Sequence, residues 1–414
     1  LLIPLILIYT LFLFTGDNQE DAFIVFRSAF NLADHGDFSY NLGEDYSGVT
    51  SYLYPFLIAL IRLLSGEHAI TVVLIVNSVA LLFTSYFFTR ILGRIFNFSN
   101  AMRDLLWIAL SIAPMTLLMA TRGMEAPYVA LFFVVGLCRI QDAPSRLTSL
   151  LPVFILPFVR PDAIAFSLIL ACFSFSVSTR IGLRYLFTAI SSAVTLTLAY
   201  YLTVGFFLPN TVLVKGENIN NQSLLDIVLR EFWICFESPL FAPVKTKYFV
   251  YAYPFFSVFA LGISAILLYK IWCIRRPYFA IIVTILAGIW LVPGAYGMSS
   301  AVFPWYFWPS RLLYQGLLIA GVLYLTTSYL LPLTARRVIG GLLLPVLLSF
   351  VVVQLAISYS KGAQESVYRA SVGKYIASLA KDDETLYLEP AGIIPFFAKI
   401  KTFDTLGLVS KMIF

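Results

Sequence analysis

The chain has 414 residues, of which 60% are hydrophobic and only 12% are charged, and its formal net charge is +6. Ordinary globular proteins carry about 25% charged residues, so a water-facing surface of this size cannot be made from this composition. The composition excludes a soluble globular domain, a disordered chain and a coiled coil, and it requires a polytopic membrane protein. Loops that set membrane orientation explain the excess of Lys and Arg, so we expect no nucleic-acid partner.

Apolar segments that could cross a membrane recur along the chain. A spanning helix needs about 20 apolar residues, and fewer where its ends are buried among neighbours. The candidates are residues 1–14, 69–95, 105–120, 127–137, 147–159, 163–177, 185–208, 249–269, 280–291, 305–330 and 338–357. The sequence therefore predicts an all-α polytopic membrane domain over residues 1–357, with about eleven transmembrane helices. We expect residues 1–14 to be a retained helix rather than a signal peptide, and the missing initial Met to reflect a trimmed N-terminus.

Basic residues are concentrated in every second connection between these segments. They are Arg90, Arg94 and Arg103; Arg139 and Arg146; Arg180 and Arg184; Lys270, Arg275 and Arg276; and Arg336 and Arg337. Cytoplasmic loops collect Lys and Arg, so these connections should face the cytoplasm. The outer segments are then residues 16–68, 121–126, 160–162, 209–247, 293–304 and 358–414. Residues 52–64 are apolar but short, and a crossing there would reverse every later loop, so we predict a juxtamembrane helix instead.

The first outer segment begins with two adjacent acids. From residue 20 to residue 33, Phe23, Phe26 and Phe30 recur at helical spacing, which predicts an amphipathic helix along the membrane surface. Glu20 and Asp21 stand at its start. One interpretation is structural, because the helix dipole favours carboxylates there. The other is a general base beneath a polar cavity at the membrane surface.

Several short motifs resemble those of a known family. Residues 20–33 (EDAFIVFRSAFNLA), 40–44 (YNLGE) and 48–51 (GVTS) are similar to the first extracytoplasmic loop of bacterial membrane glycosyltransferases of the GT-C class. The resemblance is to the branch that contains the terminal arabinofuranosyltransferases. Further motifs follow in the same order: residues 123–127 (GMEAP), 160–162 (RPD), 208–211 (LPNT) with Lys215, 304–306 (PWY) and 404–408 (DTLGL). Two residues depart from the family pattern: Glu20 replaces the usual first Asp, and Val49 replaces an aromatic residue.

This resemblance implies a reaction and a location. It implies transfer of a sugar from a polyprenyl-phosphate donor to a glycan, lipid or protein acceptor on the extracytoplasmic face of a bacterial inner membrane. Either Asp21 or Glu20 would take the proton of the attacking hydroxyl, and single displacement would invert the sugar carbon. There is no glycine-rich phosphate loop, which agrees with a lipid-linked donor rather than a nucleotide sugar.

Cations are needed for the lipid phosphate, and the candidates are Arg311, Lys215 and Arg27. Arg311 is expected about two turns into a membrane helix, where a charge is expensive and is usually functional or paired. The alternative for Arg311 is that its side chain reaches the interface, and the alternative for Lys215 is a solvated loop lysine.

The remaining candidates are sugar- or acceptor-binding residues in the outer segments: Glu125, Arg122, Arg160, Asp162, Asn210, Trp305 and Tyr306. Each has a structural alternative. Arg160 could pair with Asp162, and Arg122 with Glu125, while Trp305 and Tyr306 could belong to an interfacial aromatic belt. Two His and four Cys show no metal-ligand spacing, so we expect no cofactor, although outer carboxylates could hold a divalent cation.

The composition changes at residue 358. Helical periodicity over 367–379, strands over 384–388 and 401–403, and a helix over 390–397 predict a small extracytoplasmic α/β element in residues 358–414. Relatives continue into a larger domain, so a truncated C-terminus is an interpretation that the resemblance allows.

A transporter or flippase of lipid-linked glycans is the alternative function. It would be expected to show two related halves and polar residues at mid-membrane, whereas we find no internal repeat and the acids gather on the outer face. An oligosaccharide ligase or polymerase is a second alternative within the enzymes.

Overall fold

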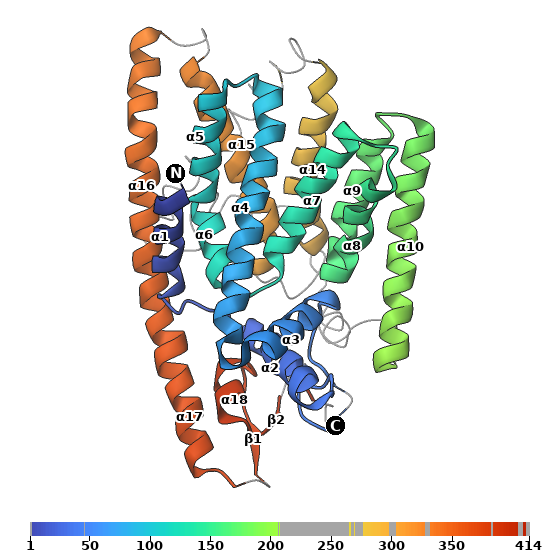
Figure 1. Cartoon of the computed structure of the whole chain (residues 1–414), viewed down its shortest axis with the longest axis vertical. Helices are drawn as coiled ribbons and strands as arrows, with labels where there is room; N and C mark the ends of the chain where they lie inside the picture. Colours follow the sequence, from blue (N-terminus) through green and yellow to red (C-terminus); the bar gives the residue numbers. More distant parts are fainter. Residues whose placement is uncertain are drawn as a thin grey trace.

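The computed structural model describes residues 2–44, 46–205, 207, 265, 269, 276–297, 304–327, 332–381, 384–404 and 409–410. Two predicted site residues, Lys215 and Asn210, and most of the span predicted at 249–269 lie outside these residues. The described chain is a helical bundle with a smaller layer across one end, which we call the foot (Figure 1).

Helices of the bundle run side by side along the long axis of the molecule (Figure 1). They are α1 (Leu2–Leu13), α4 (Ala69–Phe96), α5 (Asn100–Ser111), α6 (Pro114–Thr121), α7 (Ala126–Asp142), α8 (Leu151–Val159), α9 (Ile164–Ser174), α10 (Thr179–Val204), α14 (Arg276–Gly297), α15 (Trp308–Thr327) and α16 (Leu333–Gly362). Short 3-10 turns, η2 (Leu147–Ser149), η3 (Pro161–Ala163) and η4 (Pro304–Phe307), join some of them. Fully buried Phe88, Phe133 and Leu313 belong to one apolar core shared by these helices.

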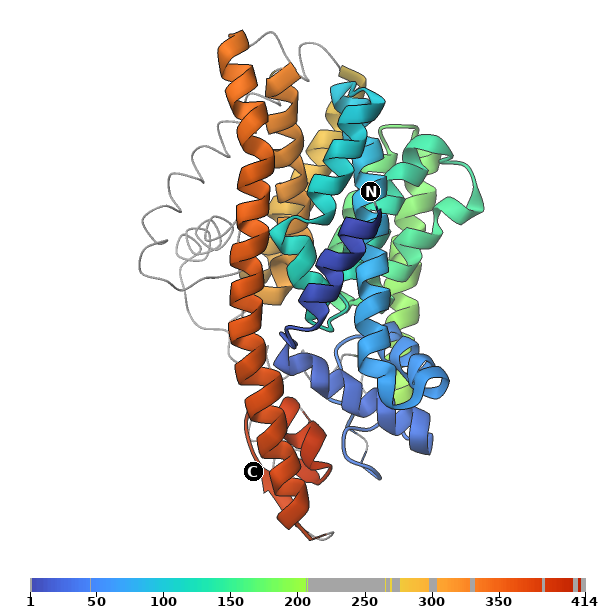
Figure 2. The ribbon, with the colours of Figure 1, turned by 60° about the vertical axis from the view of Figure 1, so that its left-hand side comes forward.

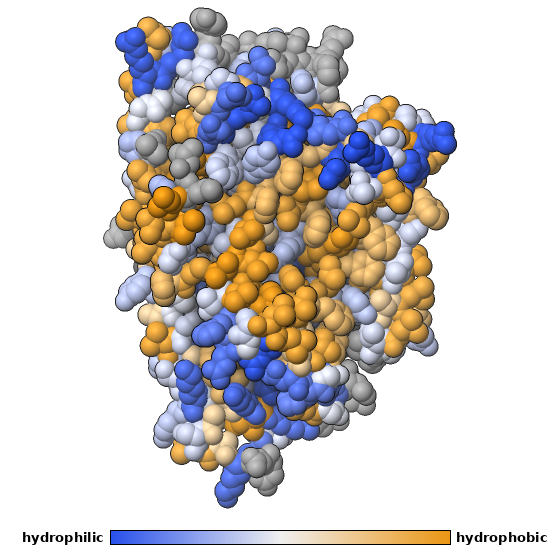
Figure 3. Space-filling model, viewed as in Figure 1, coloured by the Kyte–Doolittle hydropathy of each residue, from blue (hydrophilic) through white to orange (hydrophobic). Residues whose placement is uncertain are grey.

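The outer surface of the bundle is also apolar. Figure 3 shows an orange band around the middle of the molecule, with hydrophilic side chains gathered at the two ends. On α10, Leu202 is 81% exposed and Phe187 is 73% exposed. A band of this kind would be unstable in water but matches the hydrocarbon core of a bilayer. The protein is therefore a multi-pass membrane protein.

Only some helices are long enough to cross a membrane unaided. By length and composition, the described residues contain three such stretches, Leu53–Phe96, Thr179–Thr203 and Arg336–Leu379, and a fourth if α5 and α6, bent by 47°, form one span. The other apolar helices are shorter. The count of about eleven spans therefore stays a prediction.

Where the structure describes them, the two predicted sets of connections lie at opposite ends of the molecule. The end of α4, the end of α7 and the start of α10 meet at the end far from the foot (Figure 1). There Asp142 forms ion pairs with Arg90 and Arg94. The turns between α6 and α7 and between α8 and α9 lie next to the foot. The basic pattern thus separated the two ends correctly, and the side of the membrane that each end faces stays a prediction.

The foot is built from the first predicted outer segment and the C-terminal residues. It contains α2 (Glu20–His35), α3 (Leu53–Ser65), η1 (Gly66–His68), α17 (Ala370–Leu379), β1 (Thr385–Tyr387), α18 (Ile393–Ala398) and β2 (Lys401–Phe403). Gly66, at φ +57° and ψ −128°, ends α3 and turns the chain into α4. As a result α3 packs beside α2 across the foot (Figure 1) instead of extending α4.

A single helical rod joins the bundle to the tail. The helix α16 continues through a π-helical segment, η5 (Ala363–Arg369), into α17, and Figure 2 shows the three as one rod with the remaining tail packed at its lower end. The predicted domain boundary at residues 357/358 falls inside this rod. Beyond it, β1 and β2 form a parallel pair, which needs the crossover that α18 provides.

Candidate active site

The start of α2 is held against the turn between α6 and α7. The N–H of Gln19 donates to the carbonyl oxygen of Arg122 at 3.0 Å. Gly123 has φ +69°, and a Cβ placed on it would lie 3.0 Å from the Cζ of Phe26 and 3.3 Å from the Cβ of Ala22. A glycine is needed here because of both the left-handed backbone and this close approach. The turn and the acidic end of α2 therefore lie in direct contact.

Three turns bring their charged residues together at this end of the bundle. The Nε of Arg160 lies 3.3 Å from the Oε1 of Glu125. The same guanidinium makes a two-point contact with Asp162, at 3.0 Å from Nε to Oδ1 and 2.9 Å from Nη2 to Oδ2. Its Cζ lies 4.9 Å from the ring centre of Tyr306. Arg160 and Glu125 are buried, whereas the side chain of Asp162 is 31% exposed, so the network runs from the interior to the surface.

Asp21 belongs electrostatically to the same group. Burial raises the pKa of Glu125, Arg160 opposes that shift, and the charges of Asp162 and Asp21 add to it. Burial also raises the pKa of Tyr306, where Arg160 again opposes and the negative charges of Asp162 and Asp21 contribute. We call these five residues, Asp21, Glu125, Arg160, Asp162 and Tyr306, the acid–arginine cluster. The structure therefore brings four of the residues singled out in the sequence into contact, with Asp21 near enough for its charge to act on two of them.

Glu20 has different partners from its neighbour. Its Oε2 lies 2.6 Å from Nη1 of Arg369, and its Oε1 accepts hydrogen bonds from the N–H groups of Gly392 and Ile393 at 3.1 and 2.8 Å. Consecutive residues on an α-helix point about 100° apart. Glu20 therefore contacts the C-terminal tail, whereas the charge of Asp21 acts on the acid–arginine cluster.

Arg27 also contacts the tail. It donates to the carbonyl oxygens of Tyr40, Pro395 and Ile400, and to the side chains of Asn41 and Thr402. These contacts use all five N–H donors of a guanidinium. They do not favour the phosphate-binding role predicted for Arg27 from the sequence.

Arg122 pairs with a residue that the sequence analysis did not single out. Its Nη2 donates to Oδ2 of Asp17 at 3.0 Å, and its Nη1 to Oε1 of Gln19 at 3.3 Å. The predicted alternative of an Arg122–Glu125 pair is wrong, because the two side chains take other partners. Asp17 is fully buried; burial raises its pKa, and Arg122 opposes the shift. Asp17 and Arg122 are 105 residues apart, so no spacing rule connects them, and the only signal was an acid placed directly after an apolar helix.

Arg311 and Trp305 lie close in sequence to Tyr306. Arg311 is buried in the first turns of α15, with its Cζ 5.9 Å from the ring centre of Phe307. Trp305 packs edge-to-face on Tyr306, with the ring centres 6.1 Å apart. Both residues therefore lie at the foot end of α15.

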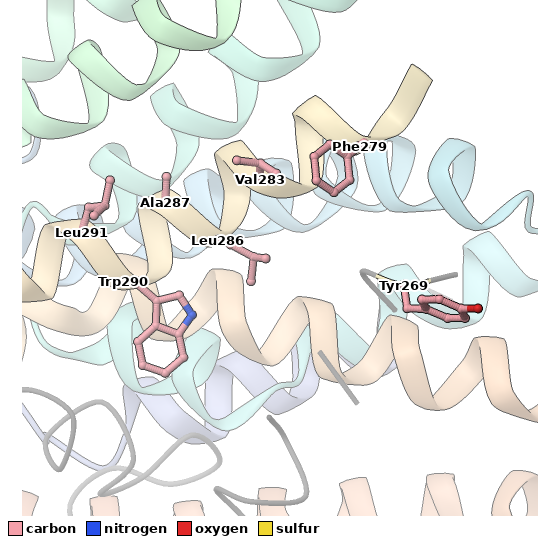
Figure 4. Close-up of a pocket in the computed structure, with 7 residues that line it drawn as sticks. All are labelled: Tyr269, Phe279, Val283, Leu286, Ala287, Trp290 and Leu291. Carbon is pink, nitrogen blue, oxygen red and sulfur yellow. The ribbon is translucent and has the colours of Figure 1, made fainter. Parts of the chain in front are cut away.

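A separate apolar hollow of about 760 Å³ runs along α14 (Figure 4). Phe279, Val283, Trp290 and Leu291 are among the residues that line it, and all of its lining side chains are apolar or aromatic. None belongs to the acid–arginine cluster, so the hollow is not where proton transfer is expected. Among the described residues, no three His, Cys, Asp or Glu side chains are grouped as a metal ion would require.

Comparison with known proteins identifies the fold. No family model matches the sequence, and no curated protein matches it. The chain does share the fold of a polytopic membrane protein of known structure, ArnT from Cupriavidus metallidurans. The apo crystal structure of ArnT has a TM-score of 0.60 and 12% sequence identity, over 97% of this chain and 85% of ArnT. The structure of ArnT bound to undecaprenyl phosphate matches over the same shares, with a TM-score of 0.52.

Proposed function

We propose that this protein is a GT-C glycosyltransferase that moves a sugar from a polyprenyl-phosphate donor to a hydroxyl acceptor at the foot of the bundle. The observation that carries the proposal is the packing of the acidic start of α2 against the turn between α6 and α7, which carries Glu125 of the Arg160 network. The charge of Asp21 acts on Glu125 and Tyr306 there. The fold adds support, because ArnT has been crystallised with undecaprenyl phosphate. The motif resemblance and the fold likeness point to the same class independently.

The proposed reaction is a single displacement. The acceptor oxygen attacks the anomeric carbon of the donor sugar, and the bond from that carbon to the phosphate oxygen breaks, so that its electron pair leaves with polyprenyl phosphate. Asp21 takes the proton of the acceptor hydroxyl as the new glycosidic bond forms. The configuration at the anomeric carbon is inverted, by analogy with one-step glycoside chemistry.

The other residues would bind and orient the substrates. We assign Arg311 and Lys215 to the donor phosphate, since a departing lipid phosphate needs cations at headgroup depth. Arg160 is engaged by two carboxylates, so we assign it to holding Glu125 and Asp162 in place. Their oxygens, with Tyr306 and Trp305, would contact sugar hydroxyls and ring faces. We assign Asn210 to acceptor binding on its LPNT motif alone.

The finer assignment follows from the resemblance. We propose a protein of the bacterial inner membrane whose foot faces the extracytoplasmic side, related to the arabinofuranosyltransferase branch, with a glycan, lipid or protein acceptor. Support for this orientation is the arginine-rich end opposite the foot, since cytoplasmic loops collect Lys and Arg.

The test is transfer by the purified protein, reconstituted in liposomes and supplied with a panel of polyprenyl-phosphate sugars. We expect Asp21→Asn to reduce transfer about 10²–10⁴-fold, which is the usual contribution of a general base. Asp104→Asn, the same change on the exposed start of α5, is the control and should keep full activity. Wild-type activity in Asp21→Asn would contradict the assigned base. Movement of an intact lipid-linked sugar across the bilayer, with no new glycosidic bond, would favour the flippase alternative.

A further inference from the structure

The first turn of α2 depends on a distant part of the chain. Gln19, the residue before α2, makes no side-chain capping bond to the helix, although the first N–H groups of a helix need partners outside it. A carboxylate in the first turn is favoured by the helix dipole without any further partner. Glu20 instead gives both of its oxygens to the tail, one to Arg369 and the other to the N–H groups of Gly392 and Ile393.

The contact between Glu20 and the tail is close at the backbone level as well. A Cβ built on Gly392 would overlap the carbonyl oxygen of Glu20 and would lie 2.7 Å from its Oε1. No side chain can be accommodated there unless the tail moves away from α2. The approach therefore depends on packing at a glycine, independently of the ion pair with Arg369.

Further contacts continue this attachment along the foot. Asn41 and Thr402 exchange two hydrogen bonds of 2.9 Å, from Nδ2 of Asn41 to the Thr402 carbonyl and from the Thr402 N–H to Oδ1 of Asn41. Arg27 binds the carbonyl oxygens of Pro395 and Ile400. The tail thus holds the start of α2, its middle and the loop that follows it.

From this geometry we propose that Glu20 and Arg369 are positioning residues, which fix the rotation of α2 so that Asp21 is directed at the acid–arginine cluster. Because residues 20 and 21 are about 100° apart around the helix, fixing one side chain fixes the direction of the other. A displacement of about 1 Å at a reacting group can cost about 100-fold in rate. The inference rests on the proposed role of Asp21 and assigns its neighbour and the tail a different role.

The kinetic test compares Arg369→Met, Arg369→Lys and Lys381→Met. Arg369→Met should lower kcat about 10–100-fold and leave the KM for a polyprenyl-phosphate sugar within about threefold, since the phosphate contacts are unchanged. Arg369→Lys keeps the charge and should recover most of kcat. Lys381 is an exposed tail residue, so Lys381→Met should behave as wild type. An unchanged kcat in Arg369→Met would overturn the inference, and so would equal losses of kcat, donor binding and thermal stability, which indicate general unfolding.

Glu20→Gln separates positioning from proton transfer. The amide oxygen of Gln can still accept from Gly392 and Ile393, so we expect a smaller loss than in Asp21→Asn, with the acidic limb of the wild-type pH profile retained. Disappearance of that limb in Glu20→Gln, with its retention in Asp21→Asn, would make Glu20 the base and overturn the inference.

Hydrogen exchange tests the attachment without an activity assay. The backbone amides of residues 22–26 should exchange faster in Arg369→Met and in Gly392→Ala than in wild type or Lys381→Met. Gly392→Ala adds no charge, so it reports the close approach alone. If the wild type transfers no sugar, the proposed function fails, yet this measurement still decides whether the tail holds α2. Unchanged exchange in both variants would show that it does not.

Discussion

The two ends of the bundle both carry ion pairs, but in opposite surroundings. At the end far from the foot, Arg90 and Arg94 pair with Asp142, and these side chains are 36–40% exposed. At the end next to the foot, the side chains of the Arg122–Asp17 and Arg160–Glu125 pairs are at most 8% exposed. Exposed pairs contribute about 0–1 kcal/mol each, whereas breaking a buried pair costs about 3–5 kcal/mol.

We interpret the exposed charges as markers of membrane orientation and the buried charges as parts of the proposed site. Arginines at a membrane surface need only water and a cytoplasmic position, so their exact partners matter little. The Arg122–Asp17 and Arg160–Glu125 pairs have been taken out of water, which is costly unless their geometry is fixed. Pairs on the outside of the foot, such as Arg62–Asp34, remain partly exposed. Retaining several such charges in one place is the pattern expected of a functional centre.

The largest effect on stability and sugar transfer is expected at Arg160. Arg160→Met leaves Glu125 and Asp162 without their shared cation, so we expect a loss of about 3–5 kcal/mol in stability and a severe loss of transfer. Thermal unfolding in detergent and the liposome assay would measure the two effects.

A double variant sharpens this test. Glu125→Gln combined with Arg160→Met should be less destabilised than the two single effects added together, by about 0.5–3 kcal/mol. Additive effects would mean that the two side chains do not depend on each other.

An intermediate effect is expected at Gly123. Gly123→Ala introduces strain at a positive φ, worth about 1–3 kcal/mol, and also pushes on Phe26 and Ala22 at the start of α2. We expect transfer to fall by about tenfold as Asp21 moves. Gly36→Ala is the matched control, because Gly36 has φ +72° and nothing within 4 Å of its Cβ position. It should lose stability but keep transfer, and equal transfer losses in both variants would contradict the role of the close approach.

The smallest effect is expected at the opposite end. Arg94→Met removes an exposed partner of Asp142, which Arg90 still contacts. We expect less than about 1 kcal/mol in stability and unchanged transfer, measured as for Arg160→Met. A loss as large as that of Arg160→Met would mean that exposure does not separate the two classes of charge.

The sequence predicted much of the fold because membrane proteins show their pattern locally. Apolar segments and alternating basic connections separated the two ends without any contact information. Five of the predicted site residues lie near one another because each is at or next to a helix end on the same side of the bundle. The positions of helix ends can be predicted from the sequence. The roles of these residues stay predictions.

What the sequence could not provide was the partner of each charge. Glu20 and Asp21 read as one acidic pair, although the helix directs them to different partners. Arg27 suggested phosphate binding, yet its contacts include Pro395, 368 residues away. Asp17 was missed because its partner Arg122 lies 105 residues away in sequence. Pairings of this kind depend on how distant segments, the tail and the turn after α6, pack against α2 and the residues before it, which no local pattern encodes.

The rod formed by α16, η5 and α17 fixes how far the tail lies from the membrane. Its stretch from Arg336 to Leu379 contains 44 residues, which span roughly 65 Å at about 1.5 Å per residue. A bilayer core is only about 30 Å thick, so the lower half of the rod must stand clear of the hydrocarbon. The distance from the membrane to the contact between the tail and Glu20 is then set by the rise of a continuous helix rather than by a loose linker. A change in bilayer thickness would therefore change the position of the first turn of α2 relative to the membrane surface.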